Sequence, residues 1–275
     1  MMGIRMIALD LDGTTLNSRR EITVRTQEAF RKASEKGVHI VVSTGRTFTA
    51  LPQQVRELSY IEYAITSNGA HINLVSTGES IFDSYLSVTA VREAARLYGE
   101  LDTEIEVFVD GRAYMDQSYY DYIVKYGLST RSAEYVLWSR TPVNGIEDLL
   151  LENENHIENI NFCFNDEAAY EAGRRAIESI PDATISSSFR NSLEVGGPET
   201  SKKAALIELT GRLGIDRSEL MCCGDAPNDI EMISYAGLGV AVGNAWGGTK
   251  ENADYITGTN DEDGVAQAIE KFVLI

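Results

Sequence analysis

Two groups of acidic residues follow apolar segments that have the composition of strands. Asp10 and Asp12 come at the end of the first apolar run, and an extended chain places side chains two residues apart on one face. Asp225 comes after a second apolar run, and Asp229 follows four residues later. Neighbouring carboxylates repel one another and are tolerated best around a cation, and Mg²⁺ prefers oxygen ligands and pairs with phosphate. Asp10, Asp12 and Asp225 are candidate magnesium ligands, although an Asp-Gly turn and a helix cap would also explain residues of these types.

Two other positions could hold an anion. Thr44 and Gly45 follow the second predicted strand, where a hydroxyl and backbone N–H groups can cradle a phosphate and glycine permits close approach. Lys202 and Lys203 begin a predicted helix, where a positive charge opposes the helix dipole and therefore suggests a functional role. An ordinary turn and solvated surface lysines are the simpler alternatives. The sequence leaves open which of the two lysines would reach a phosphate.

The elements around these residues alternate in a way that is typical of a parallel α/β sheet. Strands and helices are expected in turn at residues 4–9, 23–36, 38–42, 48–58 and 63–66. The carboxyl ends of parallel strands meet at one edge of the sheet, where open α/β sheets bind ligands. If the first strand is central, residues 219–223 form its neighbour and bring Asp225 beside Asp10 and Asp12.

The alternation changes after residue 69. A hairpin at 70–75 and 79–85, a helix at 88–99 and a hairpin turning at Asp110-Gly111 are expected there, followed by strand 157–164, helix 166–179 and strand 183–188. The βαβ pattern then resumes with strand 193–195, helix 200–213, strand 219–223, helix 228–235 and strand 238–242. We therefore expect a doubly wound, Rossmann-like core with an inserted α+β cap domain, divided into residues 1–84, 85–189 and 190–275.

Composition narrows the class of protein. The chain has 275 residues, of which 43% are hydrophobic and 24% charged, as in ordinary globular proteins. A formal charge of −18 repels nucleic acid and anionic membranes, so neither is an expected partner. Without a signal peptide or the roughly 20 apolar residues of a membrane span, a soluble cytoplasmic protein is expected. Three cysteines and three scattered histidines fit neither a disulfide framework nor a zinc site.

Taken together, the motifs resemble those of the haloacid dehalogenase superfamily. The order Asp-x-Asp, Thr, Lys and Gly-Asp-x-x-x-Asp, each at a junction of strand and loop, is that of its four motifs. The chain is similar in particular to the Cof-type phosphatases, which carry a class IIB cap. The resemblance extends over the whole length and includes Ser67-Asn68-Gly69-Ala70, Ser192-Leu193-Glu194-Val195, the segment 224–232 and Asp263-Gly264-Val265-Ala266.

The resemblance implies a mechanism. Asp10 would be the nucleophile that forms a phosphoaspartyl enzyme, and Asp12 the general acid and base. The phosphate would be bound by Leu11, Thr44, Gly45, Lys202 and Asn228. The Mg²⁺ cofactor would be bound by Asp10, Asp12, Asp225 and Asp229, of which Asp229 would lie one layer further from the ion. The expected substrate is a small phosphorylated metabolite, a sugar phosphate or similar phosphomonoester, selected by the cap of a monomeric or homodimeric hydrolase.

Two other functions remain as alternatives. A phosphomutase or phosphotransferase of the same superfamily would pass the phosphoryl group on instead of releasing it. A phosphoacceptor signalling module also combines an acidic cluster, a Thr or Ser and a Lys on a doubly wound sheet. Such modules are about half this length and use an adjacent acidic pair, which favours the phosphatase.

Overall fold

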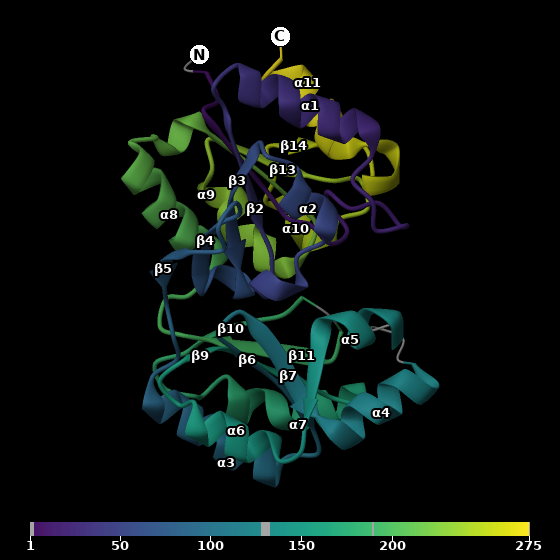
Figure 1. The fold of residues 1–275 in the computed structure, drawn as a ribbon, viewed down its shortest axis with the longest axis vertical. Helices are drawn as coiled ribbons and strands as arrows, with labels where there is room; N and C mark the ends of the chain where they lie inside the picture. Colours follow the sequence, from purple (N-terminus) through teal and green to yellow (C-terminus); the bar gives the residue numbers. More distant parts are fainter. Residues whose placement is uncertain (1–2, 128–132, 189, 275) are drawn as a thin grey trace. The chain divides into compact units, whose positions relative to one another are not determined.

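The fold is that of a computed structural model of the chain, which describes residues 3–127, 133–188 and 190–274 (Figure 1). The chain divides into two compact units. Unit 1 comprises Met1–Gly45, Leu51–Phe82 and Ser201–Ile275, and unit 2 comprises Arg46–Ala50 and Asp83–Thr200. Each unit has its own sheet, so the two are described separately.

Unit 1 is built on an eight-stranded sheet in the order β14-β13-β12-β1-β2-β3-β4-β5. The parallel strands are β1 (Met6–Leu9), β2 (His39–Ser43), β3 (Ile61–Thr66), β12 (Leu220–Gly224), β13 (Leu238–Ala241) and β14 (Tyr255–Ile256). The strand β4 (His71–Leu74) runs antiparallel to β3, and β5 (Ser80–Asp83) forms the edge. Every residue of β1 is buried, as expected for a parallel strand covered on both faces.

Helices cover both faces of this sheet. Figure 1 shows α8 (Lys202–Leu213) and α9 (Ile230–Tyr235) on one side and α1 (Val24–Glu35) with α11 (Gly264–Phe272) on the other. Met6 and Ala8 of β1 pack into one apolar cluster with residues of α8 and α9. The short helices α2 (Gln53–Glu57) and α10 (Gly247–Glu251) complete the unit. The predicted neighbourhood of the first strand is confirmed, because β12 and β2 flank β1 in parallel.

The helix ends predicted from local sequence signals are confirmed in part. Thr23 caps α1 by accepting a hydrogen bond from the Thr26 backbone N–H, as its residue type predicts. The single helix expected at 48–58 is wrong, because the structure has a 3-10 turn at Phe48–Ala50 and begins α2 only after Pro52. Proline fixes its own φ and lacks an N–H, so it starts a helix more readily than it continues one.

Unit 2 contains a six-stranded sheet in the order β10-β11-β9-β6-β7-β8. Its strands are β6 (Glu104–Val109), β7 (Arg112–Asp116), β8 (Arg140–Val143), β9 (Ile157–Cys163), β10 (Thr184–Ser186) and β11 (Ser192–Gly196). One apolar cluster joins the sheet to α3 (Val88–Glu100), α6 (Ile146–Glu152) and α7 (Glu167–Ile177). A smaller cluster joins it to α4 (Gln117–Tyr126) and α5 (Ala133–Ser139). The expected α/β class, with a parallel core and an inserted second unit, is confirmed.

One strand lies in a different sheet from the one expected. The sequence predicts that strand 193–195 belongs to the sheet of the core domain, but β11 pairs antiparallel with β9 and β10 in unit 2. Leu193 and Val195 face the apolar cluster of unit 2, whereas Ser192 and Glu194 alternate with them. This alternation is typical of an antiparallel strand, but three residues of sequence, 193–195, are too few to distinguish it from a parallel strand. Strand β8 and helix α6 were not expected at all.

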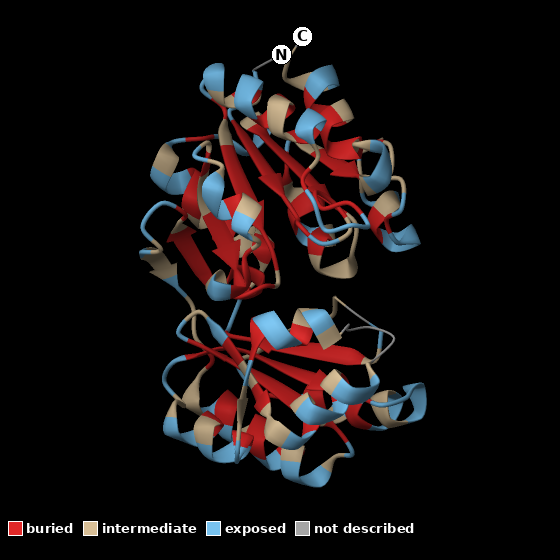
Figure 2. Ribbon diagram, turned by 45° about the vertical axis from the view of Figure 1, so that its right-hand side comes forward, coloured by how far each residue is buried: buried red, intermediate tan, exposed pale blue. Residues whose placement is uncertain are grey.

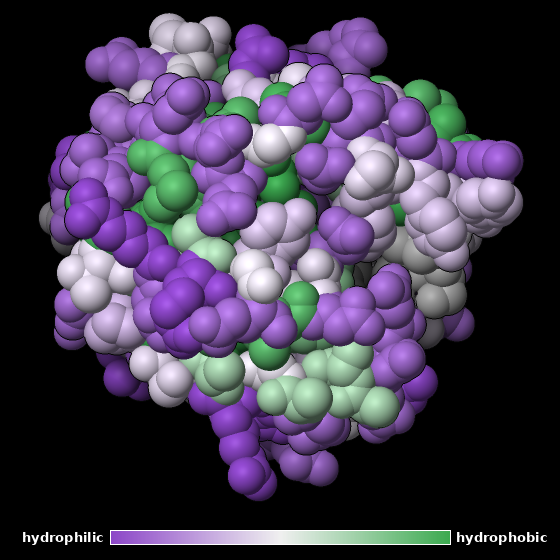
Figure 3. Space-filling view, turned by 90° about the horizontal axis from the view of Figure 1, so that it is seen from below, coloured by the Kyte–Doolittle hydropathy of each residue, from purple (hydrophilic) through white to green (hydrophobic). Residues whose placement is uncertain are grey.

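The distribution of burial follows these layers. Figure 2 shows that the strands of both sheets are mostly buried, while the outer helices alternate between buried and exposed residues. The face in Figure 3 is mostly hydrophilic, and its hydrophobic side chains appear in small separate groups. All three cysteines are buried. Within the part of the chain that the structure describes, no helix has the length and apolarity needed to cross a membrane.

Candidate active site

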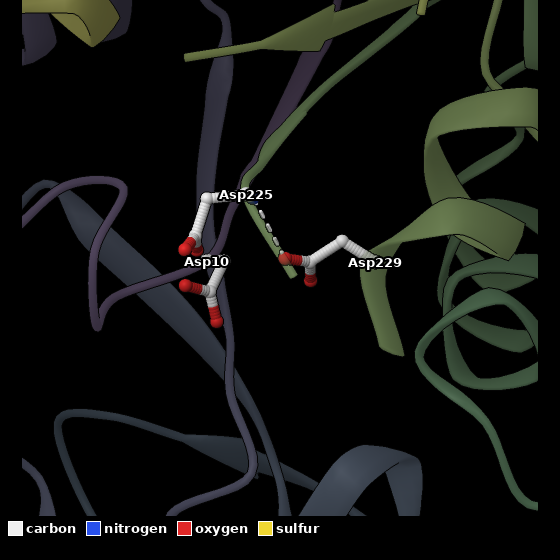
Figure 4. Close-up of side chains that lie close together, drawn as sticks. All are labelled: Asp10, Asp225 and Asp229. Carbon is white, nitrogen blue, oxygen red and sulfur yellow. Dashed lines mark hydrogen bonds between the residues drawn. The ribbon is translucent and has the colours of Figure 1, made fainter. Parts of the chain in front are cut away.

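The acidic residues of two neighbouring strands meet at the carboxyl edge of the unit 1 sheet. Asp10 directly follows β1, and its backbone N–H donates to the Cys223 carbonyl of β12 at 3.0 Å. Asp225 directly follows β12. Oxygens of Asp10, Asp225 and Asp229 all lie within 4.8 Å of one another. Figure 4 shows the carboxylates of Asp10 and Asp225 close together, with Asp229 extending toward them from the turn Pro227–Asp229.

The carboxylate of Asp229 organises the loop after β12. Its Oδ2 atom accepts hydrogen bonds from the backbone N–H groups of Asp225 at 3.0 Å and Ala226 at 3.1 Å. The first of these bonds is the dashed line in Figure 4. The side chain of Asp229 is completely buried. Asp229 therefore fixes the backbone on which Asp225 stands.

Lys202 joins the two acidic segments. Its Nζ atom donates to Asp10 Oδ1 and to Asp229 Oδ1, each at 2.7 Å, and the residue is only 1% exposed. Ser201 caps α8 by accepting from the Ala204 backbone N–H, which starts the helix at Lys202. Lys203 points elsewhere, because it pairs with Glu231 at 3.2 Å and its side chain is 38% exposed. Of the two lysines, the structure thus places Lys202 beside Asp10 and Lys203 beside Glu231.

Burial controls the electrostatics of this cluster. Burial raises the pKa of Asp10 well above its usual range, Lys202 opposes the shift, and the charges of Asp229 and Asp225 add to it. Burial and the charge of Asp229 raise the pKa of Asp225 to about 6. Burial would lower the pKa of Lys202, but the carboxylates of Asp10 and Asp229 outweigh it and raise that pKa. One ammonium therefore does not compensate three carboxylates, of which those of Asp10 and Asp229 are buried and that of Asp225 is partly buried.

The segment after β1 supports Asp225 from the other side. Thr14 Oγ1 donates to Asp225 Oδ1 at 2.9 Å. Gly13 has a φ of +81°, and a Cβ atom there would lie 2.6 Å from Asp225 Oδ2, so only glycine fits. Asp12 is exposed and lies outside the group of three, although its charge also raises the pKa of Asp225.

The remaining candidate residues lie around the same sheet edge. Thr44 is buried and follows β2, the neighbour of β1 on the side opposite β12. The sequence also suggested that Thr44 and Gly45 open a helix, but the next helical turn begins only at Phe48. Leu11 is completely buried. Asn228 donates from Nδ2 to Asn68 Oδ1 at 3.0 Å.

Asn68 was not among the expected site residues. In the sequence, the segment Ser67-Asn68-Gly69-Ala70 contributes only to the family resemblance. Its contact with Asn228 spans 160 positions of the chain and therefore has no local signal.

The comparisons with known proteins agree with this geometry. A family model described as haloacid dehalogenase-like hydrolase matches residues 7–269. The chain belongs to this family. The 5-amino-6-(5-phospho-D-ribitylamino)uracil phosphatase YcsE of Bacillus subtilis is 33% identical over 98% of this chain and 96% of its own length.

Two solved structures extend the likeness to the fold. A haloacid dehalogenase-like hydrolase from B. subtilis superposes with a TM-score of 0.85 at 29% identity, covering 98% of this chain and 100% of that one. A sugar phosphatase of HAD subclass IIB superposes with a TM-score of 0.83 at 25% identity and the same coverage. The interpretation as a Cof-type member of the superfamily, and as a phosphoric monoester hydrolase, is confirmed.

Proposed function

We propose that this phosphatase hydrolyses a small phosphorylated metabolite through a phosphoaspartyl intermediate on Asp10, with Mg²⁺ as cofactor. The observation that carries the proposal is the buried ammonium of Lys202, held at 2.7 Å from both Asp10 and Asp229 beside Asp225. A carboxylate approaches a phosphate dianion only where positive charge offsets their repulsion. A buried lysine against the nucleophile supplies part of that charge.

The residues of the site fit a magnesium ion. Their three carboxylates offer oxygen atoms within 4.8 Å of one another, and carboxylate oxygens are the ligands that Mg²⁺ takes in proteins. Asp10, Asp225 and either the side chain or the backbone carbonyl of Asp12 would hold the ion. We propose that Asp229 supports these ligands without binding the ion directly, since both of its carboxylate oxygens already accept hydrogen bonds. When bound, Mg²⁺ would neutralise charge on the carboxylates and on the phosphate oxygens.

In the first half-reaction, Asp10 attacks phosphorus while the bond from phosphorus to the leaving oxygen breaks. Lys202 stabilises the charge on the equatorial oxygens, and Thr44, Gly45, the Leu11 backbone and Asn228 bind them. Asp12 donates its proton to the departing oxygen, so an alcohol is released instead of an alkoxide. The products of this step are the alcohol and the phosphoaspartyl enzyme.

In the second half-reaction, water attacks the phosphorus of the phosphoaspartate. Asp12, now ionised, accepts the proton of that water. The bond between phosphorus and the Asp10 oxygen breaks, which releases inorganic phosphate and restores the carboxylate. The exposure of Asp12, in contrast to buried Asp10, suits a group that exchanges protons with water.

The relatives suggest a class of substrate. One acts on a phosphorylated ribitylaminouracil, another on sugar phosphates, and a third, from Cronobacter sakazakii, is an HMP-PP phosphatase. We propose a phosphomonoester of a small polyhydroxylated metabolite as substrate, with no nucleic acid or membrane partner, in a cytoplasmic monomer or homodimer. The charge of −18 supports the exclusion of polyanionic partners.

The test is a phosphate-release screen over a panel of sugar phosphates and other small phosphomonoesters, with the wild type and Asp10→Asn side by side. The wild type should release inorganic phosphate when Mg²⁺ is present and should stop in excess chelator. The Asp10→Asn enzyme should be inactive on every substrate, because an amide oxygen does not form the phosphoenzyme. Recovery of a phosphorylated product in place of inorganic phosphate would instead identify a phosphotransferase. Full activity in chelator would refute the metal assignment.

A further inference from the structure

The turn between β3 and β4 has an unusual backbone. Ser67, Asn68 and Gly69 have φ values of 49°, 57° and 104°, so three consecutive residues lie in the left-handed region. Two of them carry side chains, and all three are buried. Residues other than glycine adopt such conformations only when the surrounding structure holds them there, and such turns concentrate at functional sites.

The turn is surrounded by the segments whose residues we propose to bind the substrate phosphate. The Asn68 backbone N–H donates to the Thr44 carbonyl at 3.1 Å, and a Cβ atom on Gly45 would lie 3.1 Å from Asn68 Oδ1. A Cβ atom on Gly69 would lie 2.2 Å from the Ser201 carbonyl oxygen, which precedes Lys202. The turn thus lies against both the loop after β2 and the start of α8.

The third contact reaches the loop after β12. Asn68 Oδ1 accepts from Asn228 Nδ2 at 3.0 Å, and Asn68 is only 5% exposed. A phosphate oxygen only accepts hydrogen bonds, so an asparagine binds it through the amide nitrogen and not through the amide oxygen. The bond to Asn68 Oδ1 keeps the nitrogen of Asn228 in a fixed place and opposes rotation of the amide about its last torsion, which is otherwise a soft one.

We infer that Asn68 is a positioning residue that orients the amide of Asn228 toward the substrate phosphate. The inference rests on the proposed function, in which Asn228 binds that phosphate. Asn68 combines a left-handed backbone with a side-chain oxygen that accepts a hydrogen bond from the loop after β12. Asparagine suits both requirements, since it tolerates this conformation better than most residues and its oxygen accepts the bond.

A purely structural role for the turn predicts different behaviour. A second side-chain bond at the same place, from Thr66 Oγ1 to Asn73 Oδ1 at 3.0 Å, holds the ends of the turn together and touches no residue that we assign to the phosphate. Asn73→Ala is therefore a matched control, because it removes one buried asparagine from β4, the strand that follows the turn. It should lower the melting temperature and leave the affinity for phosphate unchanged.

The experiment is a double-mutant cycle with Asn68→Gly, Asn228→Ala and the double variant. Glycine keeps the left-handed backbone and removes only the amide. Steady-state kinetics with p-nitrophenyl phosphate and saturating Mg²⁺ give kcat and KM, and inhibition by inorganic phosphate gives Ki. Asn68→Gly should raise KM and Ki about threefold to tenfold, the range expected for one neutral hydrogen bond, with a smaller change in kcat. In the Asn228→Ala background it should change neither value further, because its target is gone.

Additive effects in the cycle, or an equal rise of Ki in Asn73→Ala, would overturn the inference while leaving the proposed function intact. No phosphate release by the wild type under any condition would overturn both. If Asn68→Gly does not fold, the same cycle with Asn68→Ser applies the same criterion, since the serine hydroxyl is too short to reach Asn228.

Discussion

Replacement of Lys202 by methionine tests the electrostatic core of the proposed site. Methionine has a similar length and lacks the charge, so the change removes two hydrogen bonds of 2.7 Å with little change in volume. Lys203→Met is the matched control on the same helical turn. Lys203 is 38% exposed and contacts Glu231, which is 57% exposed, so its contribution is screened by solvent.

The expected cost has two parts. Loss of a positioned charge that stabilises the transition state costs about 2 to 4 kcal/mol, which lowers kcat/KM roughly 30-fold to 1,000-fold. Breaking a buried ion pair destabilises a fold by about 3 to 5 kcal/mol, because the remaining charges stay buried without a partner. The second figure is an upper limit here, since burial already raises the pKa of Asp10 and a proton can replace part of the lost charge. The control should change either quantity by less than about 1 kcal/mol.

Two measurements separate these parts. Phosphate release gives kcat/KM, and thermal unfolding with and without Mg²⁺ gives stability. In the wild type, three carboxylates face one ammonium, whereas in Lys202→Met they face none. Mg²⁺ should therefore raise the melting temperature of Lys202→Met more than that of the wild type. The ion binds the folded state, and in the variant it would compensate carboxylate charges that no ammonium compensates.

The reasoning would be refuted by a Lys202→Met enzyme with wild-type kcat/KM, or by equal losses in the two lysine variants. Equal stabilisation of wild type and Lys202→Met by Mg²⁺ would show that the lysine and the metal do not share the same carboxylates. A variant that is inactive and also unfolded at room temperature is separated from a catalytic defect by circular dichroism.

Three other predictions concern the residues around this core. Asp225→Asn keeps an oxygen that accepts from Thr14 but loses one charge, so the Mg²⁺ concentration for half-maximal activity should rise about tenfold or more in a titration. Asp12→Ala should release a burst of nitrophenol from p-nitrophenyl phosphate and then stall, and rapid quench should find no burst with a sugar phosphate, whose leaving group needs the proton. Equal impairment of both first steps would contradict the role of Asp12 as the acid. Gly13→Ala should lower stability by roughly 1 to 2 kcal/mol and raise the Mg²⁺ requirement, because its Cβ atom would displace Asp225. Gly37→Ala, at a φ of +80° with nothing within 4 Å, should share the stability cost in urea titrations and leave the Mg²⁺ requirement unchanged.

The regular elements were predictable where local signals were strong. The cap residue Thr23 and the apolar face of its helix predict α1 within one residue at each end. Pro52 is a local signal against a continuous helix at 48–58, because proline begins a helix more readily than it continues one. The sheet to which β11 belongs was not predictable, because pairing is decided by partners far along the chain. A five-residue strand carries too little pattern to specify those partners.

The sequence predicts the positions of some site residues better than those of others. Convergence of Asp10 and Asp225 follows from two facts available in the sequence, namely that both end strands and that parallel strands end together. The choice between Lys202 and Lys203 needed the exact start of α8, which a sequence pattern does not give to one residue. The role of Asn68 depends on a left-handed turn and on a partner 160 positions away, so residue type alone could not indicate it.

The connectivity of unit 1 explains how these separate segments reach one place. The strands β12, β1, β2 and β3 are adjacent and parallel, so the loops that follow them emerge at the same edge of the sheet. Those four loops carry Asp225, Asp10, Thr44 and Asn68 respectively. Lys202 comes from α8, which follows the long excursion of the chain through unit 2. Because that excursion lies between β5 and α8, it interrupts none of the four strands, and the cluster depends only on the sheet of unit 1 and the start of one helix.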